Sequence, residues 1–111
     1  MLSIIIPARN ELDNLEGILN YFINSSMNGI NYEVIMINDF SEDNTLEQAK
    51  RVFKSQGNFK VFDNNKKGLG GAINLGIEKS NGTKIINSLH RILLTVLVFS
   101  TLFFNTGSFL F

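Results

Sequence analysis

The sequence predicts an α/β fold built around a parallel sheet. Four short apolar runs alternate with three segments whose apolar residues recur at helical spacing, which gives the order β-α-β-α-β-α-β. Alternation of this kind is typical of parallel strands joined by right-handed helical crossovers. The chain has 111 residues, which is the length of one domain at most.

The first strand and helix are predicted from an apolar run and from the spacing that follows it. Residues 2–6 (LSIII) form the run, and we expect Pro7 to end the strand because proline cannot donate a ladder hydrogen bond. Apolar residues then recur at helical spacing over about residues 11–24, and the polar segment 25–31 predicts a loop. Asn10 is the expected N-cap of this helix.

The second strand is predicted from residues 34–37 (VIMI), whose β-branched side chains indicate burial on both faces of a sheet. This run breaks at once into the polar and acidic segment 38–45 (NDFSEDNT). Thr45 and Gln48 have the spacing of a capping box, so we expect the second helix to begin there and to end at residues 56–58 (QGN).

The remaining elements follow the same alternation. Residues 59–62 (FKVF) predict a third strand, and a polar loop over residues 63–67 leads into a glycine-rich turn at residues 68–71 and a third helix. Asn81 and Gly82 predict the end of that helix, because both residue types tolerate positive φ. Residues 83–86 begin a fourth strand.

Composition excludes several classes of function. The chain has 10 basic and 10 acidic residues, so nothing indicates nucleic-acid binding, which usually requires a basic excess. It has no cysteine, which removes disulfides and thiolate metal sites. Its one histidine, His90, has no serine or cysteine partner that the sequence identifies, so we expect it to be solvated or interfacial rather than catalytic.

Charge predicts a second part at the end of the chain. Residues 92–111 carry no charge, and we divide the chain into a domain over residues 1–87 and a hydrophobic tail over residues 88–111. The tail just reaches the length of a transmembrane helix, and the basic residues before it would then keep the domain cytoplasmic. The alternative is an aberrant C-terminus that is buried or aggregates.

Candidate binding residues follow the first two strands. In open α/β sheets, ligands lie beyond the carboxyl ends of the strands. Asp39 is placed there and could accept hydrogen bonds from a base or a ribose hydroxyl. The alternative is a turn aspartate that caps the second helix. Glu11 could hold a ribose hydroxyl and also lie in the first turn of the first helix.

Lys67 precedes the glycine-rich turn before the third helix. A helix N-terminus that follows glycine offers unpaired N–H groups to phosphate, and the lysine adds charge. The spacing is not that of G-x-G-x-x-G, because Ile73 fills the third glycine position, and it lacks the lysine of a P-loop. A glycine-rich turn for close packing is the alternative.

Three motifs taken together resemble family 2 glycosyltransferases, and most closely the dolichol- or polyprenyl-phosphate sugar transferases. They are residues 7–11 (PARNE), residues 38–41 (NDFS) with Asp43 and Thr45, and residues 67–72 (KGLGGA) with Asn74 and Gly76. The resemblance covers about residues 2–86. It implies a Rossmann-like sheet that forms the N-terminal half of an A-type glycosyltransferase fold.

The same resemblance implies a nucleotide-sugar site for a UDP- or GDP-linked donor. Pro7, Ala8 and Glu11 would line the base and ribose. Asp39 would recognise the base, and Lys67 would lie near the diphosphate. A membrane or a polyprenyl phosphate is implied as a further partner.

Two departures from the family pattern affect the expected activity. The family usually has Asp-Asp where this chain has Asn38-Asp39, and it places an Asp-x-Asp that binds Mg²⁺ or Mn²⁺ after the fourth strand, where residues 88–91 (SLHR) hold no acid. We therefore predict no metal and no catalytic residue, and a truncated chain that does not transfer sugar. The alternatives are a non-catalytic nucleotide-binding module and a membrane-tethered interaction module.

Overall fold

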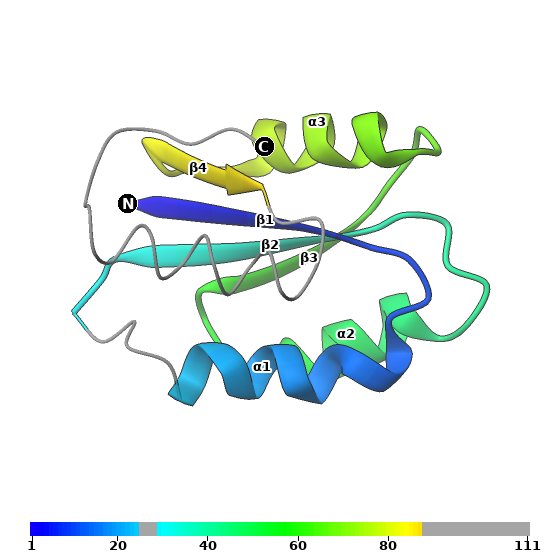
Figure 1. Ribbon diagram of the computed structural model, residues 1–111, viewed down its shortest axis with the longest axis horizontal. Coiled ribbons are helices and arrows are strands. Elements are labelled where there is room, and N and C mark those ends of the chain that lie inside the picture. The colour runs from blue at the N-terminus through cyan, green and yellow to red at the C-terminus, as the bar shows by residue number, and fades with distance from the viewer. Residues whose placement is uncertain (25–28, 88–111) are drawn as a thin grey trace.

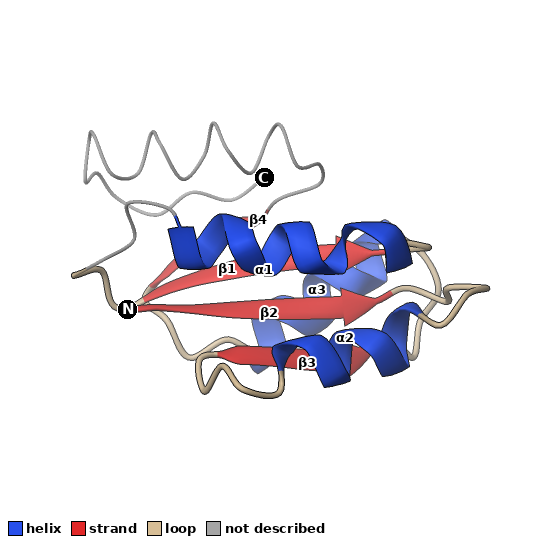
Figure 2. Ribbon diagram, turned by 90° about the horizontal axis from the view of Figure 1, so that it is seen from below, coloured by secondary structure: helices blue, strands red, loops and turns tan. Residues whose placement is uncertain are grey.

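The computed structural model describes residues 1–24 and 29–87, and these form a four-stranded parallel sheet (Figures 1 and 2). The strand order is β3-β2-β1-β4. The strands are β1 (Leu2–Ala8), β2 (Tyr32–Asn38), β3 (Phe59–Asp63) and β4 (Lys84–Asn87). The predicted α/β class and the predicted order of elements are confirmed. The hydrophobic helix predicted over residues 88–111, and with it the proposed division at residue 87, lies outside the described residues.

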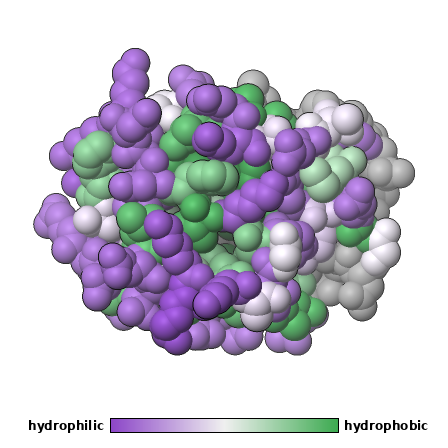
Figure 3. All heavy atoms as spheres, turned by 180° about the vertical axis from the view of Figure 1, so that it is seen from behind, coloured by the Kyte–Doolittle hydropathy of each residue, from purple (hydrophilic) through white to green (hydrophobic). Residues whose placement is uncertain are grey.

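Helices cover both faces of the sheet. The helices are α1 (Leu15–Asn24), α2 (Thr45–Phe53) and α3 (Leu69–Lys79), and a short 3₁₀ turn, η1 (Leu12–Asn14), precedes α1. Figure 1 shows α1 and α2 on one face and α3 on the other. Figure 3 shows one side of the molecule, where apolar groups are interspersed among polar ones. No helix within residues 1–24 and 29–87 has both the length and the apolar content that crossing a bilayer requires.

The core consists of two apolar layers because successive strand residues point to opposite faces. Ile4, Ile6, Val34 and Met36 pack with α1 and α2, whereas Ile5, Ile35 and Ile37 pack against Ala72 of α3. The run predicted to be buried on both faces is buried throughout, since residues 34–37 are all at most 1% exposed. The central strands therefore fix the positions of the turns at their ends.

The prediction that Pro7 ends the first strand was wrong. β1 runs to Ala8, and Pro7 pairs with Ile37 of β2. On its other side, β4 pairs with β1 only as far as Ile5, so within the described residues Pro7 has a ladder neighbour on one side only. Proline is tolerated at such an edge-like position because a single neighbouring strand makes fewer demands on its missing N–H group.

The predicted start of the first helix was also wrong in detail. Residues 12–14 form the 3₁₀ turn, and α1 begins only at Leu15. Asn10 is not an N-cap: its φ is 55°, and its Oδ1 accepts a hydrogen bond of 2.8 Å from the Glu42 N–H. Glu11 holds the cap position of the 3₁₀ turn without a side-chain cap hydrogen bond. The Asn10 side chain is used between loops instead.

The predicted capping box of the second helix does not form. Thr45 lies inside α2, whose N-cap is Asn44, and Gln48 N–H donates to Asn44 O at 3.0 Å. The Thr45 hydroxyl instead accepts from Glu11 N–H at 3.0 Å and donates to Asp43 Oδ1. The Thr45 hydroxyl therefore binds a residue that is distant in sequence instead of capping its own helix.

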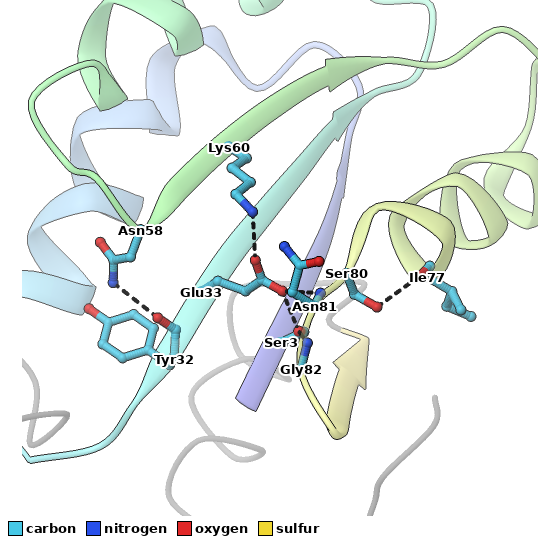
Figure 4. Close-up of polar contacts among 9 residues, drawn as sticks. All are labelled: Ser3, Tyr32, Glu33, Asn58, Lys60, Ile77, Ser80, Asn81 and Gly82. Atoms are coloured by element: carbon cyan, nitrogen blue, oxygen red, sulfur yellow. Dashed lines mark hydrogen bonds and ion pairs between the residues drawn. The ribbon is translucent and has the colours of Figure 1, made fainter. Parts of the chain in front are cut away.

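A buried polar cluster lies at the amino edge of the sheet (Figure 4). Glu33 of β2 is 3% exposed, and its Oε2 accepts hydrogen bonds of 2.6 Å from both Ser3 Oγ and Asn81 N–H. Lys60 Nζ lies 3.1 Å from Glu33 Oε1, and Gly82 N–H donates to Ser3 Oγ at 2.9 Å. Glu33 thus ties the connection between α3 and β4 to the centre of the sheet.

Candidate functional site

The turns after β1, β2 and β3 meet at the carboxyl edge of the sheet. Asp39 N–H donates to Ala8 O at 2.8 Å, which joins the end of β2 to the end of β1. Asn64 N–H donates to Asn38 O at 2.8 Å, which joins the end of β3 to the end of β2. Parallel pairing therefore brings together segments that are about 30 residues apart in sequence.

Asp39 is the central side chain of this edge. It is 8% exposed, and its Oδ1 accepts hydrogen bonds of 3.0 Å from the Gly68 N–H and from Asn64 Nδ2. The carboxylate therefore links β2 to the start of α3. The alternative in which Asp39 caps the second helix does not hold, because the N-cap of α2 is Asn44.

Asn64 organises the loop before α3, and sequence reasoning treated it only as a polar loop residue. It is 4% exposed, its Nδ2 donates to Lys66 O at 2.7 Å, and its Oδ1 accepts from Lys66 N–H at 3.2 Å. An asparagine side chain can stabilise a turn because its amide hydrogen-bonds the backbone two residues further on, as a backbone group of a turn would. The signal that could have identified it was an asparagine at a strand end, four residues before a helix-starting glycine.

The start of α3 requires glycine at two positions for different reasons. Gly68 has φ of 115°, which L side chains rarely adopt. A Cβ at Gly71 would overlap the carbonyl oxygen of Lys66, so the helix packs directly on the loop. Lys67 is exposed and immediately precedes Gly68. Its charge thus lies at a helix N-terminus, where anions are favoured.

Glu11 is held at the same edge through the start of α2. Its N–H donates to Thr45 Oγ1, and its Oε2 accepts from Asn14 Nδ2 at 2.7 Å. The Thr45 hydroxyl lowers the pKa of Asp43 below its ordinary value, and this outweighs the opposing effect of desolvation. Asn10 N–H also donates to Ser41 Oγ at 3.0 Å, so several hydrogen bonds join the turns after β1 and β2.

Asn38, the departure from the family's Asp-Asp pair, has a partner that suits an amide. Its Nδ2 donates to Asp63 Oδ1 at 2.9 Å, and its Oδ1 accepts from Ser41 Oγ at 2.6 Å. An aspartate here would place two carboxylates together. Beside them a pocket of about 340 Å³ is lined by Phe40, the first turn of α2 and its preceding residues.

The structure places all five predicted site residues at one edge of the molecule. Ala8 contacts Asp39 directly through its carbonyl, and Lys67 precedes the glycine that Asp39 binds. Glu11 joins them through Thr45, while Pro7 is the penultimate residue of β1. Ala8 is 1% exposed, and its carbonyl accepts the Asp39 N–H, so it supports Asp39 rather than presenting a surface of its own. Their role in nucleotide binding stays a prediction.

Within residues 1–24 and 29–87, no group of three or more acidic, histidine or cysteine side chains is arranged to hold a metal ion. The position at which the family's metal motif was expected, residues 88–91, lies outside the described residues.

The family model for glycosyl transferase family 2 matches residues 3–88. The chain belongs to glycosyl transferase family 2. The resemblance drawn from the three motifs is therefore confirmed at the level of the family. The matched segment contains every strand and helix described above except Leu2, the first residue of β1.

Two of the curated relatives that the chain resembles are named as dolichol-phosphate sugar transferases. The dolichol-phosphate mannosyltransferase of Pyrococcus furiosus is 37% identical over 82 residues, which are 73% of this chain and 23% of that protein. The dolichyl-phosphate β-glucosyltransferase of Mus musculus is 34% identical over 95 residues, which are 77% of this chain and 29% of that protein. The chain thus spans about a quarter of the length of the curated relatives that it matches.

Solved structures show the same fold. TarS 1–349 of S. aureus matches with a TM-score of 0.67 at 20% identity, over 89% of this chain and 32% of that one. The mannosyltransferase PcManGT from Pyrobaculum calidifontis, in complex with GDP-Man and Mn²⁺, matches with a TM-score of 0.66 at 19% identity, over 86% of this chain and 30% of that one. The described sheet therefore corresponds to the N-terminal part of A-type glycosyltransferase structures.

Proposed function

We propose that this chain binds a nucleotide sugar at the carboxyl edge of its sheet and does not by itself transfer the sugar. One observation carries the proposal: the buried carboxylate of Asp39 joins the end of β2 to the N-terminus of α3, while its own N–H binds the end of β1. A charged acceptor fixed at a strand end is suited to orient a base.

Each predicted residue then has a role in holding the donor. Asp39 accepts an N–H of the base, and Glu11 accepts a ribose hydroxyl. Pro7 lies beside the donor at the end of β1, and the buried Ala8 holds Asp39 in place through its carbonyl. Lys67 and the free N–H groups at the start of α3 attract the diphosphate. The solved structures of TarS with UDP-GlcNAc and of PcManGT with GDP-Man support a nucleotide sugar as the ligand class.

The absence of transfer follows from the donor set of this chain. Departure of a nucleoside diphosphate develops negative charge, which a divalent cation normally neutralises. Residues 88–91 (SLHR) supply no carboxylate where the family has its metal motif. Within the described part of the chain, the carboxylates do not form a metal-binding group either. The names of the dolichol-phosphate relatives suggest a polyprenyl phosphate as the acceptor class.

Titration calorimetry with UDP-GlcNAc and with GDP-mannose tests the proposal on the full chain. The variant Asp39→Asn keeps one oxygen for Gly68 and Asn64 but turns an amide N–H₂ toward the base, so we expect binding of the preferred donor to weaken about tenfold or more. Asp13→Asn is the matched control, because Asp13 is an exposed carboxylate of η1.

Two outcomes contradict the proposal. Failure of both donors to bind, or equal affinity in the Asp39→Asn variant, removes the binding site. Release of labelled sugar onto a polyprenyl phosphate or water, abolished by EDTA, shows that the chain transfers sugar after all. Binding that EDTA does not change, without turnover, is the expected result.

A further inference from the structure

One of the two oxygens of the Asp39 carboxylate is already hydrogen-bonded within the chain. Oδ1 accepts two hydrogen bonds of 3.0 Å, one from the Gly68 N–H and one from Asn64 Nδ2. A carboxylate oxygen has about two lone-pair sites, so these two donors fill Oδ1. Both hydrogen bonds that the described residues donate to this carboxylate end on the same oxygen. Only Oδ2 is left for a ligand.

The two donors that fill Oδ1 are themselves fixed. Gly68 is the N-cap of α3 with φ of 115°, and its carbonyl accepts the first helical hydrogen bond from Ala72 N–H at 3.0 Å. Asn64 is buried and also binds both backbone groups of Lys66. Asp39 is 8% exposed, so rotation of its carboxylate would break two hydrogen bonds in a site with little water to replace them.

Nucleobases differ in how many donors they present to a carboxylate. Uracil offers a single imide N–H between two carbonyl groups, which needs one acceptor oxygen. Guanine offers N1–H and the N2 amino group side by side, and this pair is satisfied by two carboxylate oxygens, as in other bidentate contacts.

We propose that Asn64 and Gly68, by filling one oxygen of Asp39, make this site selective for uridine nucleotides over guanosine nucleotides. The inference rests on the proposed nucleotide-sugar function and narrows its donor class. Asn64 acts through Asp39 and is therefore a positioning residue. Guanine would have to displace Asn64 to gain its second acceptor, so we expect UDP to bind about tenfold more tightly than GDP, or better.

Competition binding with UDP, GDP and N3-methyl-UDP on the full chain tests the selectivity. N3-methyl-UDP carries a methyl group in place of the imide hydrogen, so it can no longer donate to Asp39, and we expect it to bind about tenfold more weakly. Equal or tighter binding of GDP, with that binding still dependent on Asp39, overturns the selectivity but leaves the proposed function intact. Failure of all three nucleotides to bind overturns the proposed function itself.

The pair Asn64→Ala and Asn65→Ala tests the role of the buried asparagine. Asn65 is its exposed neighbour, so the control changes the same residue type in the same loop. We expect Asn64→Ala to reduce the ratio of UDP to GDP affinity and Asn65→Ala to leave it unchanged. An unchanged ratio in a folded Asn64→Ala variant refutes the positioning role. If that variant does not fold, the N3-methyl-UDP comparison on the unmodified chain decides the question.

Discussion

Replacing Glu33 by glutamine should destabilise the domain by about 2 kcal/mol at neutral pH. The carboxylate accepts from Ser3 Oγ and Asn81 N–H on one oxygen and lies 3.1 Å from Lys60 Nζ on the other. Hydrogen bonds to a charged group contribute about 1.5–3 kcal/mol each and neutral ones about 0.5–1.5 kcal/mol, so weakening the two bonds on Oε2 costs about 1 kcal/mol each.

The lysine adds little to this magnitude. The Lys60 side chain is 37% exposed, so it can turn to water when its partner loses charge. Ion pairs with one solvated partner contribute about 0–1 kcal/mol. Lys60→Met should therefore cost less than about 1 kcal/mol, and the comparison separates the hydrogen bonds from the ion pair.

The pH dependence gives a second check on the same variant. Burial raises the pKa of Glu33, but the hydrogen bonds from Ser3, Asn81 and Lys60 outweigh it, so the folded-state pKa lies below the ordinary value of 4.5. A carboxyl group with a lowered folded-state pKa contributes stability above its unfolded pKa and loses it as pH falls through the folded value. The difference between the native chain and Glu33→Gln should therefore shrink below about pH 4.5.

Urea denaturation followed by circular dichroism, at neutral pH and below pH 4.5, measures both effects on the full chain. Glu47→Gln is a suitable control because Glu47 is an exposed carboxylate of α2. A Glu33→Gln variant within about 0.5 kcal/mol of the native chain at neutral pH would refute the view that this cluster ties α3 and β4 to the sheet.

Two further predictions concern backbone positions. A Cβ at Gly76 would overlap Ile5 Cγ2, and Ile5 is fully buried, so Gly76→Ala should destabilise the domain by about 1–2 kcal/mol. A Cβ at Gly70 would meet open space, so Gly70→Ala should stabilise the domain by about 0.4–1 kcal/mol in the same denaturation assay. Equal effects of the two substitutions would contradict the tight packing of α3 on β1. Phe40 has φ of 54° and is 42% exposed, so Phe40→Gly should raise the stability of the domain by about 0.5–1 kcal/mol through relief of backbone strain. A loss of stability in thermal melts would instead mean that the Phe40 side chain packs against the domain.

Local patterns predicted the elements because the signals for them are local. The apolar run 34–37 and the helical spacing of the three amphipathic segments each depend on neighbouring residues alone, and these elements appear where they were expected. The placement of Asp39 at a strand end followed from the same alternation. The turn that carries Asp39 meets the turns after β1 and β3, and this follows from the rule that parallel strands end at the same edge of a sheet.

The errors arose where a distant partner overrode a local rule. Thr45 has the sequence context of a capping box, but its hydroxyl binds the Glu11 N–H, 34 positions away. Pro7 stays within β1, where it pairs with Ile37 of β2, and among the described residues β4 pairs with β1 only as far as Ile5. The hydrogen bond from Asn64 to Asp39 joins residues 25 positions apart, so the spacing of Asn64 from Gly68 was the only local sign of its role.

The sheet order has a consequence for how the chain assembles. β1, β2 and β3 are neighbours in the sheet and follow one another in the sequence. The other side of β1 pairs with residues 84–87, so Leu2 can pair with Lys84 only after Lys84 has been synthesised. During synthesis β1 therefore presents an open edge, which is a template for another chain, until the last described strand is released. We expect the contacts between β1 and β4 to form after the folding transition state. Weakening the junction of β1 and β4 should accelerate unfolding while the folding rate stays nearly constant.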